Sequence, residues 1–284
     1  MWQRACTLAA GTIIFSVTTA AAQQTVYVDG VTGSDDWDGL CAVWDGALCG
    51  PKATIQAGID AATDGDSVLL ADGTYTGPGN RDIDFHGKAI TVRSAHGAPE
   101  SCTIDCETAA RGFNFHGGEG ATSVLAGVTI TNGRADYGGG VYLLESSPTL
   151  RDCRIIDNHT YAVYCSLGSP TFDNCVIATG SVFLEGSDAI LIECEITDNN
   201  TAGIRILDGS NATLRRCTIA RNLNGVVVGH SDPQLIACTI VHNSGILGTG
   251  LWLHFSNATL TGCTIADNAV EHDGGGFYSF ASAP

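Results

Sequence analysis

A pattern of apolar and polar positions recurs along the second half of the chain, with the consensus Leu-x-x-Cys-x-Ile-x-x-Asn. Full copies begin at Leu150, Leu191, Leu214, Leu235 and Leu260. A copy from Phe172 lacks the Asn, and one from Leu125 lacks the Cys. Successive cysteines of the pattern are 22, 19, 23, 21 and 25 residues apart, so the repeat is kept over six copies.

A second apolar segment lies between successive copies of this pattern. It begins at Gly140, Ala162, Ser181, Gly203, Gly225, Gly250 and Gly276. Each repeat therefore holds two or three short segments rich in β-branched residues, separated by Gly, Asn, Asp or Ser turns, with no room for a helix as well. Short strands repeating every ~20 residues predict an all-β fold, a parallel β-helix in which each coil stacks on the one before.

Alternation along each strand decides which side chains point inward. The Cys and Ile of the repeat share parity, so both are predicted to face the core. The Asn follows this strand by three positions; Asn tolerates left-handed turns and its amide both donates and accepts. We therefore expect a structural ladder of cysteines and one of asparagines, with a polar binding row as the alternative for the latter. The cysteine ladder comprises Cys153, Cys175, Cys194, Cys217, Cys238 and Cys263, and the asparagine ladder comprises Asn158, Asn199, Asn222, Asn243 and Asn268.

The outward positions of the second segment are unusually aromatic. They are Tyr142, Tyr164, Phe183, Arg205, Val227, Trp252 and Tyr278. Five of these seven are aromatic, although aromatic residues make up 7% of the chain. Aromatic faces with converging polar groups suit sugar rings or protein partners; the alternative is a ladder that stacks on itself for stability. The ligand-binding candidates are Tyr142, Tyr164, Phe183, Arg205, Trp252 and the adjacent His254.

Residues 1–22 have the features of a signal peptide. Arg4 supplies a positive start, an apolar stretch reaches Val17, and small residues precede Gln23. A membrane anchor is the alternative, but the apolar run is short for one, and no later segment is long enough to span a membrane. We expect a protein that is secreted or displayed at the cell surface or outer membrane.

Residues 23–66 are predicted to form a cap loop and a capping helix ahead of the β-helix of residues 67–284. The helix is expected from Thr54 to Ala62, where apolar residues recur at i, i+4 and i+7. A helix there would close the open end of the coils and prevent edge-to-edge pairing. At the other end, residues 274–284 repeat residues 138–148 and the sequence stops in mid-coil without a cap, so we expect the chain to be part of a longer protein.

The net charge of the chain limits the kinds of partner that it can bind. The chain has 13 Lys and Arg against 30 Asp and Glu, a net charge of −17. Nucleic acid binding depends on clustered basic residues, so it is excluded as a function, and anionic membranes are disfavoured. The expected partner is a polysaccharide or a cell-surface protein.

Removal of the signal peptide leaves 11 of the 12 cysteines. In an exported protein, Cys41 with Cys49 and Cys102 with Cys106 are candidates for local disulfides. The ladder cysteines are expected to be stacked free thiols, with disulfides between coils as the alternative. A metal site needs a tetrahedral cluster of ligands, which a single row does not provide.

We expect no cofactor, with one alternative in the cap loop. Residues 34–39 are similar to a calcium-binding loop, with Asp36, Asp38 and Asp45 as weak Ca²⁺ candidates. Ser34 occupies the first ligand position, however, and Trp37-Asp38-Gly39 recurs as Trp44-Asp45-Gly46, which favours a disulfide-pinned loop.

The segments 53–62, 65–68 and 72–75 resemble the opening of the right-handed parallel β-helix (pectate-lyase-like) superfamily. The later repeats resemble those of polymorphic outer-membrane proteins, through Gly139-Gly140-Val141 and Ile155-x-x-Asn158. The resemblance covers residues 25–284 and implies a right-handed solenoid. It implies no single activity, because the superfamily contains lyases, hydrolases, epimerases, adhesins and phage tailspikes.

A catalytic constellation is hard to find. A lyase of this superfamily needs Ca²⁺-binding carboxylates beside an Arg or Lys base, and a polygalacturonase-like hydrolase needs paired Asp with a neighbouring His. The coils contain no Asp-Asp pair, and Gly229-His230-Ser231 departs from the Gly-His-Gly of the hydrolases at Ser231. The weak catalytic candidates are Glu185, Arg205, Asp208 and His230. Ordinary solvated side chains are the alternative.

Three functions remain open. The first is a non-catalytic surface or secreted protein that binds glycan or protein through the aromatic face, and we expect this one. The second is a polysaccharide lyase or glycoside hydrolase, and the third is a structural spacer in a larger surface protein.

Overall fold

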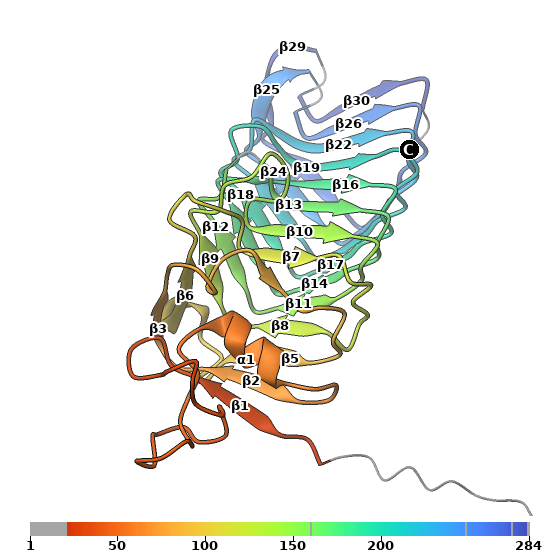
Figure 1. The fold of residues 1–284 in the computed structure, drawn as a ribbon. Coiled ribbons are helices and arrows are strands. Elements are labelled where there is room, and N and C mark those ends of the chain that lie inside the picture. Colours follow the sequence, from red (N-terminus) through yellow and green to blue (C-terminus); the bar gives the residue numbers. More distant parts are fainter. Residues whose placement is uncertain (1–21, 160, 248, 274, 283–284) are drawn as a thin grey trace, which may run out of the picture.

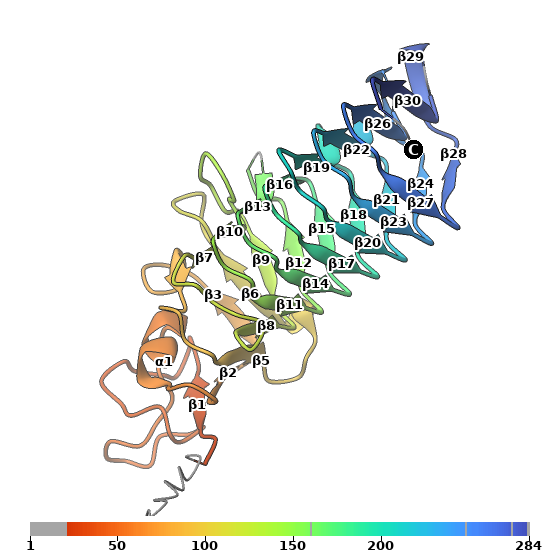
Figure 2. The ribbon, with the colours of Figure 1, turned by 90° about the vertical axis from the view of Figure 1, so that its right-hand side faces the viewer.

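Three long parallel sheets build the molecule, because each repeat contributes one strand to each of them (Figure 1). The computed structural model describes residues 22–159, 161–247, 249–273 and 275–282. The proposed signal peptide thus lies outside the described residues, apart from Ala22. Figure 2 shows the coils from the side, stacked one on the next from the N-terminal end to the C-terminal end.

From β2 onward, the strands of the three sheets follow one another in every coil. Sheet A contains β1 (Thr25–Val28), β2 (Ser67–Leu70), β5 (Thr91–Ser94), β8 (Val124–Ala126), β11 (Thr149–Arg151), β14 (Thr171–Asp173), β17 (Ile190–Ile192), β20 (Thr213–Arg215), β23 (Gln234–Ile236) and β27 (Thr259–Thr261). Sheet B contains β3 (Gly73–Tyr75), β6 (Cys102–Asp105), β9 (Thr129–Thr131), β12 (Arg154–Ile156), β15 (Val176–Ala178), β18 (Glu195–Thr197), β21 (Thr218–Ala220), β24 (Thr239–Val241) and β28 (Thr264–Ala266). Sheet C contains β4 (Ile83–Asp84), β7 (Phe113–Phe115), β10 (Val141–Leu144), β13 (Tyr161–Ser166), β16 (Ser181–Glu185), β19 (Ala202–Leu207), β22 (Asn224–Gly229), β26 (Leu251–His254) and β30 (Phe277–Phe280). A separate pair, β25 (Ser244–Leu247) and β29 (Ala269–Asp273), lies between sheets B and C in the last coils.

Like residues pair with like residues across the coils. Ile155 of β12 pairs with Ile130 on one side and Ile177 on the other. All three side chains are fully buried. A slip of one residue would turn every buried side chain of a strand to the solvent, so this apolar column fixes the register. The predicted parallel β-helix is confirmed.

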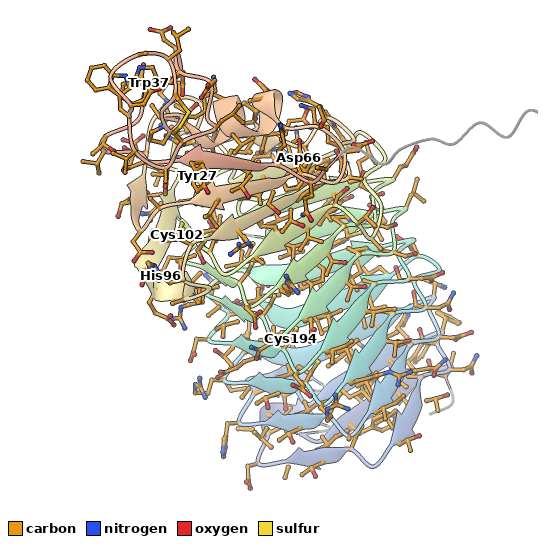
Figure 3. The ribbon with its side chains drawn as sticks, turned by 90° about the horizontal axis from the view of Figure 1, so that it is seen from below. Tyr27, Trp37, Asp66, His96, Cys102 and Cys194 are labelled. Carbon is orange, nitrogen blue, oxygen red and sulfur yellow. A yellow bond between two sulfur atoms is a disulfide. The ribbon has the colours of Figure 1, made fainter. Side chains whose placement is uncertain are left out.

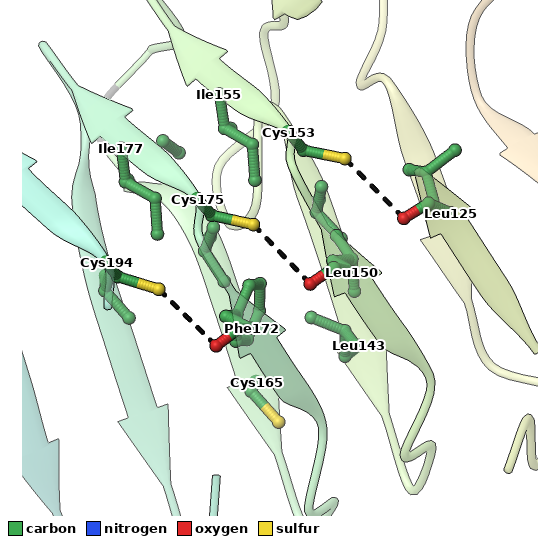
Figure 4. Close-up of a cluster of buried hydrophobic side chains, with 14 of the residues drawn as sticks. Leu125, Leu143, Leu150, Cys153, Ile155, Cys165, Phe172, Cys175, Ile177 and Cys194 are labelled. Carbon is green, nitrogen blue, oxygen red and sulfur yellow. Dashed lines mark hydrogen bonds between the residues drawn. The ribbon is translucent and has the colours of Figure 1, made fainter. Parts of the chain in front are cut away.

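The cysteine ladder lies inside the solenoid, at the turn from sheet A to sheet B (Figure 4). Its first five members are buried, the last is half-buried, and all six are free thiols. Each thiol donates a hydrogen bond to a carbonyl of the preceding coil, as Cys175 Sγ does to Leu150 O (3.5 Å) and Cys194 Sγ to Phe172 O (3.4 Å). The thiols therefore act as small buried side chains with a weak donor.

The asparagine ladder lies at the turn from sheet B to sheet C. Asn222 Nδ2 donates to Asn243 Oδ1 (3.0 Å), and Asn243 Nδ2 donates to Asn268 Oδ1 (2.9 Å). The coil between Asn158 and Asn199 has no Asn at this position, and there the Gly180 N–H donates to Asn199 Oδ1 (2.6 Å). The side-chain ladder thus satisfies buried backbone groups that the turns would otherwise leave unpaired.

A short helix covers the first coil, as the sequence predicted. α1 (Ile55–Ala61) begins after Thr54, whose hydroxyl accepts a hydrogen bond from the Ala57 N–H. Ile55 and Ile59 are buried against the end of the coils. Sheet A begins with β1, which precedes this helix in the chain. The helix therefore packs on β1 and also on β2 and β4, which follow it in the chain. A short 3₁₀ helix, η1 (Pro99–Ser101), precedes β6.

The four cysteines of the first half of the described chain differ in their oxidation state. Cys41 and Cys49 form a disulfide with their Cα atoms 5.3 Å apart. The expected bond between Cys102 and Cys106 is wrong, since both are free and buried. They lie four residues apart along an extended strand, which separates their Cα atoms by about 13 Å, and a disulfide spans at most about 7 Å. Burial raises the pKa of each thiol to about 12.

Within the described residues, no helix has the length and apolar character needed to cross a membrane.

Candidate functional site

The outward aromatic residues of sheet C form one continuous column. Strand register places Tyr142 beside Tyr164, Tyr164 beside Phe183, and Phe183 beside Arg205. The Tyr142 and Tyr164 rings are stacked at 5.5 Å between centroids, and those of Tyr164 and Phe183 at 5.4 Å. The rings therefore lie one above the next at about the spacing of neighbouring strands.

Tyr164 is the least accessible member of this column. Only 8% of it is exposed, because the Tyr137 ring lies against it at 4.8 Å. Its hydroxyl donates a hydrogen bond to the Glu185 carboxylate. Burial, together with this carboxylate, raises the pKa of the Tyr164 phenol well above its ordinary value. Tyr164 is therefore the buried residue at the centre of a wider group of aromatic rings.

We call that group the tyrosine cluster; its members are Tyr137, Tyr142, Tyr161, Tyr164 and Phe183. Tyr137 is 50% exposed and stacks on Tyr161, with 6.0 Å between centroids and only 3° between ring planes. Tyr161 in turn meets Phe183 edge to face at 5.0 Å. One loop and three strands from successive coils thus combine into one apolar surface with an exposed edge.

The second half of the column is less regular. Arg205 is half-buried, and its buried Nε has no hydrogen-bond partner among the described residues. Val227 interrupts the rings, and Trp252 resumes them with Tyr278 at 6.5 Å. The Trp252 Nε1 is also buried without a partner in the described part of the chain. His254 pairs with Gly229 and lies at the end of its strand, two residues from Trp252.

A polar cleft adjoins the tyrosine cluster, between the turns that lead from sheet B to sheet C. One part has a volume of about 490 Å³ and the adjoining part about 570 Å³. Both parts are lined by Thr108, Arg134 and His159; Asn132, Asp157 and Thr179 line the first, and Arg111 and Asp136 line the second. A cleft of this size lies within the range that takes a small ligand or a few sugar residues.

Arg111 joins the cleft to the cluster. Its guanidinium carbon lies 4.6 Å from the centroid of the Tyr142 ring, a cation–π contact. Its Nε is also 3.4 Å from Asp82 Oδ1, which fixes the side chain from the other side. On the first part of the cleft, the Thr179 hydroxyl donates to Asp157 Oδ1 (2.7 Å). The cleft thus offers hydrogen-bond donors and acceptors, including both basic and acidic side chains, beside a row of aromatic rings.

The four weak catalytic candidates lie on three successive coils. Asp208 and His230 occupy equivalent turns of neighbouring coils, where the Asp208 N–H donates to Gly229 O (3.1 Å) and the Gly209 N–H donates to His230 O (2.8 Å). Register pairs Glu185 with Leu207, one column away from Arg205. Asp208 and His230 occupy turns with φ of 55° and 50°, beyond the ends of β19 and β22. Glu185 is engaged by the Tyr164 hydroxyl, as described above. Among the residues that the structure describes, no ion pair or side-chain hydrogen bond joins any two of these four candidates.

Two of the predicted histidines belong instead to a second ring group at the edge of sheet C. His230 stacks on Phe255 at 5.3 Å, and His254 stacks on Phe280 at 5.4 Å. The two histidine rings meet edge to face at 5.7 Å. Phe255 is 49% exposed. This group is separate from the tyrosine cluster along the chain and along the column.

The proposed calcium ligands turn toward their own loop. Asp38 Oδ1 accepts from the Leu40 N–H (2.9 Å), and Asp45 Oδ1 accepts from the Ala47 N–H (2.8 Å). Asp36 is exposed. Over the part of the chain that the structure describes, no group of three or more His, Cys, Asp or Glu side chains is placed to hold a metal ion. Calcium binding by this loop stays a prediction.

Sequence reasoning missed the cleft and the loop residues of the tyrosine cluster. Arg111, Arg134, Tyr137 and His159 lie in turns, where alternation gives no direction. One signal was present. Nine residues separate β9 from β10, whereas only two separate β15 from β16. Where the turn between two strands is longer than the equivalent turn of another coil, the extra residues project beside the sheet and line a cleft.

Comparison with known proteins agrees with this architecture. The family model described as right-handed β-helix region matches residues 68–183 and 170–283. No curated protein matches the sequence of this chain.

Several solved structures share the fold. Pectate lyase Pel9A is 15% identical with a TM-score of 0.60, over 92% of this chain and 80% of that one. A rhamnogalacturonan lyase is 14% identical with a TM-score of 0.62, over 83% and 74%. Pectin methylesterase from carrot is 14% identical with a TM-score of 0.53, over 92% and 90%. At such identities the likeness concerns the fold alone. With three quarters of its length matched by the family model, the chain belongs to the right-handed β-helix family.

Proposed function

We propose that this protein binds a polysaccharide along the outer face of sheet C, at the tyrosine cluster and the adjoining polar cleft. The observation that carries the proposal is the position of Arg111, which lies on the Tyr142 ring and also lines the cleft. Sugar rings have apolar faces and hydroxyl edges. A row of rings beside a row of donors and acceptors matches both.

The solved structures with the same fold favour this class of ligand. A pectate lyase, a rhamnogalacturonan lyase and a pectin methylesterase are named for polysaccharides of the pectin group. The net charge of −17 argues against unassisted binding of an acidic polymer, because like charges repel unless a cation lies between them. A neutral polysaccharide is therefore the preferred ligand.

The role we propose is non-catalytic, since no ion pair or side-chain hydrogen bond within the described chain joins any two of the four weak catalytic candidates. The protein acts outside the cell, either secreted or held at the surface as in the polymorphic outer-membrane proteins that its repeats resemble. The disulfide between Cys41 and Cys49 supports an oxidising compartment.

Binding to immobilised polysaccharides tests the proposal. Pectate, rhamnogalacturonan and a neutral glucan are compared, each with and without Ca²⁺. Tyr137→Ala and Tyr142→Ala should each weaken binding about 3- to 10-fold, because one ring contact is lost. Phe255→Ala is the matched control, since Phe255 is as exposed as Tyr137 but lies in the other ring group.

Two results would overturn the proposal. Equal losses in Phe255→Ala and Tyr137→Ala would place the ligand elsewhere. Release of new reducing ends or unsaturated sugars from any polymer would show an enzyme, and the non-catalytic role would then be wrong.

A further inference from the structure

The cap loop of residues 37–50 carries a concentration of exposed apolar side chains. Leu40, Val43, Trp44 and Leu48 are 47%, 78%, 53% and 71% exposed. Exposed apolar side chains usually occur singly on a soluble protein, and several together mark a site of interaction. Figure 3 shows this loop, with Trp37, at the N-terminal end of the solenoid, away from the repeated coils. We call residues 37–50 the stapled loop.

Several bonds hold the stapled loop in one conformation. The disulfide between Cys41 and Cys49 closes it. The Asp45 carboxylate accepts from the N–H groups of Ala47 (2.8 Å) and Cys49 (3.2 Å). Trp44 donates from Nε1 to Ala47 O (3.0 Å). A surface whose side chains are already ordered loses less entropy when it binds.

The tryptophan pair adds to this order. The Trp37 and Trp44 rings are stacked at 5.5 Å with 5° between their planes. Gly50 lies directly against the Trp37 ring, since a Cβ at that position would be 2.3 Å from it. Trp37 is thus wedged between Gly50 and Trp44. The outer ring, Trp44, stands on this support with half of its surface exposed.

Charge decides which kind of partner fits. Asp35, Asp36, Asp38 and Asp45 are exposed on or beside the stapled loop. Residues 23–51 contain no Lys, Arg or His, and the first basic residue after them, Lys52, donates from Nζ to Asp35 O (3.0 Å). An apolar surface with an acidic border repels nucleic acid and anionic lipid, and it complements a protein surface whose apolar residues are bordered by Lys or Arg.

A small apolar cavity lies beside the loop. Its volume is about 160 Å³, and its lining includes Ala42 and Pro51 from the loop side and Tyr27 and Leu69 from sheet A. This is below the size of clefts that take free ligands. The cavity instead suits a single apolar side chain of a larger partner.

We propose that the stapled loop is a docking site for a protein segment in which apolar side chains are flanked by Lys or Arg. The apolar side chains of that segment pack on Trp44, Val43 and Leu48, and its basic residues face the aspartates of the border. The site lies on the cap of the solenoid and is independent of the polysaccharide face on sheet C.

Peptide display tests the proposal. A library of random linear peptides on phage is panned against the folded, disulfide-bonded chain, and in parallel against Val43→Ser/Leu48→Ser. Both substituted side chains are exposed, so the fold is kept, which thermal unfolding checks. The expected result is enrichment, on the unsubstituted chain only, of peptides with apolar residues next to Lys or Arg. The double substitution should lower the affinity for a synthetic copy of such a peptide at least about tenfold.

The controls separate the alternatives. Leu167→Ser removes a side chain that is 62% exposed in the turn after β13, and it should leave peptide binding unchanged. Raising the salt concentration should weaken binding, because the basic residues of the peptide face exposed carboxylates. Phosphatidylcholine vesicles serve as the lipid probe and should not bind.

Four outcomes would overturn the proposal: no enrichment, equal enrichment on the double variant, enriched peptides without basic residues, or vesicle binding that the double substitution abolishes. The last would assign the loop to a lipid surface instead.

Discussion

Removing one amide from the middle of the asparagine ladder should destabilise the protein far more than an ordinary surface change. We choose Asn222→Ala. Asn222 Oδ1 accepts from the Asn199 N–H (3.1 Å) and from Asn199 Nδ2 (2.7 Å). Its Nδ2 donates to Ile196 O (3.0 Å) and to Asn243 Oδ1 (3.0 Å).

The structure allows the cost to be estimated. Asn243 Oδ1 keeps a donor in the variant, because the backbone N–H of residue 222 also bonds to it (2.9 Å). The two Asn199 donors, which are both buried, lose the one acceptor that they have among the described residues. Each buried unsatisfied group costs about 1–3 kcal/mol, so we expect the free energy of unfolding to fall by about 2–6 kcal/mol.

Asn268→Ala is the matched control at the end of the ladder. It removes the acceptor of the Asn243 N–H (3.0 Å) and of Asn243 Nδ2 (2.9 Å). However, Asn243 Nδ2 also donates to Ile219 O (3.1 Å), so only one donor is left without a partner. The expected loss is about half of that for Asn222→Ala, or about 1–3 kcal/mol.

Urea unfolding followed by circular dichroism measures both losses, and hydrogen exchange shows whether the opening is local to the coils around Asn222. A repeat solenoid loses cooperativity more readily than a globular domain, so coincidence of the two probes is required before a single free energy is quoted. A loss below about 1 kcal/mol for Asn222→Ala, or an equal loss in the two variants, would refute the account of the ladder as a chain of obligatory hydrogen bonds.

Three further predictions concern ionisable groups. After denaturation without reductant, all six thiols of the cysteine ladder should be alkylated, and in the folded protein Cys263 should react first because it is half-buried; mass spectrometry that finds the ladder oxidised would contradict this. Arg221 donates a hydrogen bond to Asp198 and lowers the pKa of that carboxyl below its ordinary value of 3.8. The pair therefore stabilises the fold fully at pH values above 3.8. This contribution is lost as the pH falls through the lowered pKa. Arg221→Gln should therefore cost about 0.2–1 kcal/mol near neutral pH and nothing in strong acid, as pH-dependent unfolding will report. Glu185→Gln should lower the pKa of Tyr164 toward its ordinary value, and an unchanged ultraviolet titration would show that burial alone sets it.

The coils could be predicted from sequence because each position is specified twice. Parity within a strand decides inside or outside, and the repeat decides the neighbour on the next coil. For Cys194 and Ile196 both rules gave the same answer, and the same rules placed Tyr142 beside Tyr164. The expected disulfide between Cys102 and Cys106 is wrong because equal parity on one extended segment places both side chains inside and far apart.

The cleft could not be predicted in this way. Tyr137 and Arg134 lie in a turn between β9 and β10, and the direction of a turn depends on contacts with neighbouring turns rather than on alternation. The sequence shows that the turn is long, but only the structure shows that it folds back over Tyr164. The same holds for the stapled loop, whose two Trp-Asp-Gly motifs gave no sign that their rings stack.

The strict column register also bears on how such a molecule changes over generations. Because every coil presents the same positions to its neighbours, removing the 23 residues 194–216 would set Cys217 in the place of Cys194 and leave each ladder continuous. Duplication of the same segment would add a coil with equal ease, since contacts in a solenoid are with nearest neighbours. The number of coils can therefore drift by genetic insertion and deletion, while the polar cleft and the stapled loop on the cap, which lie outside residues 194–216, are inherited unchanged.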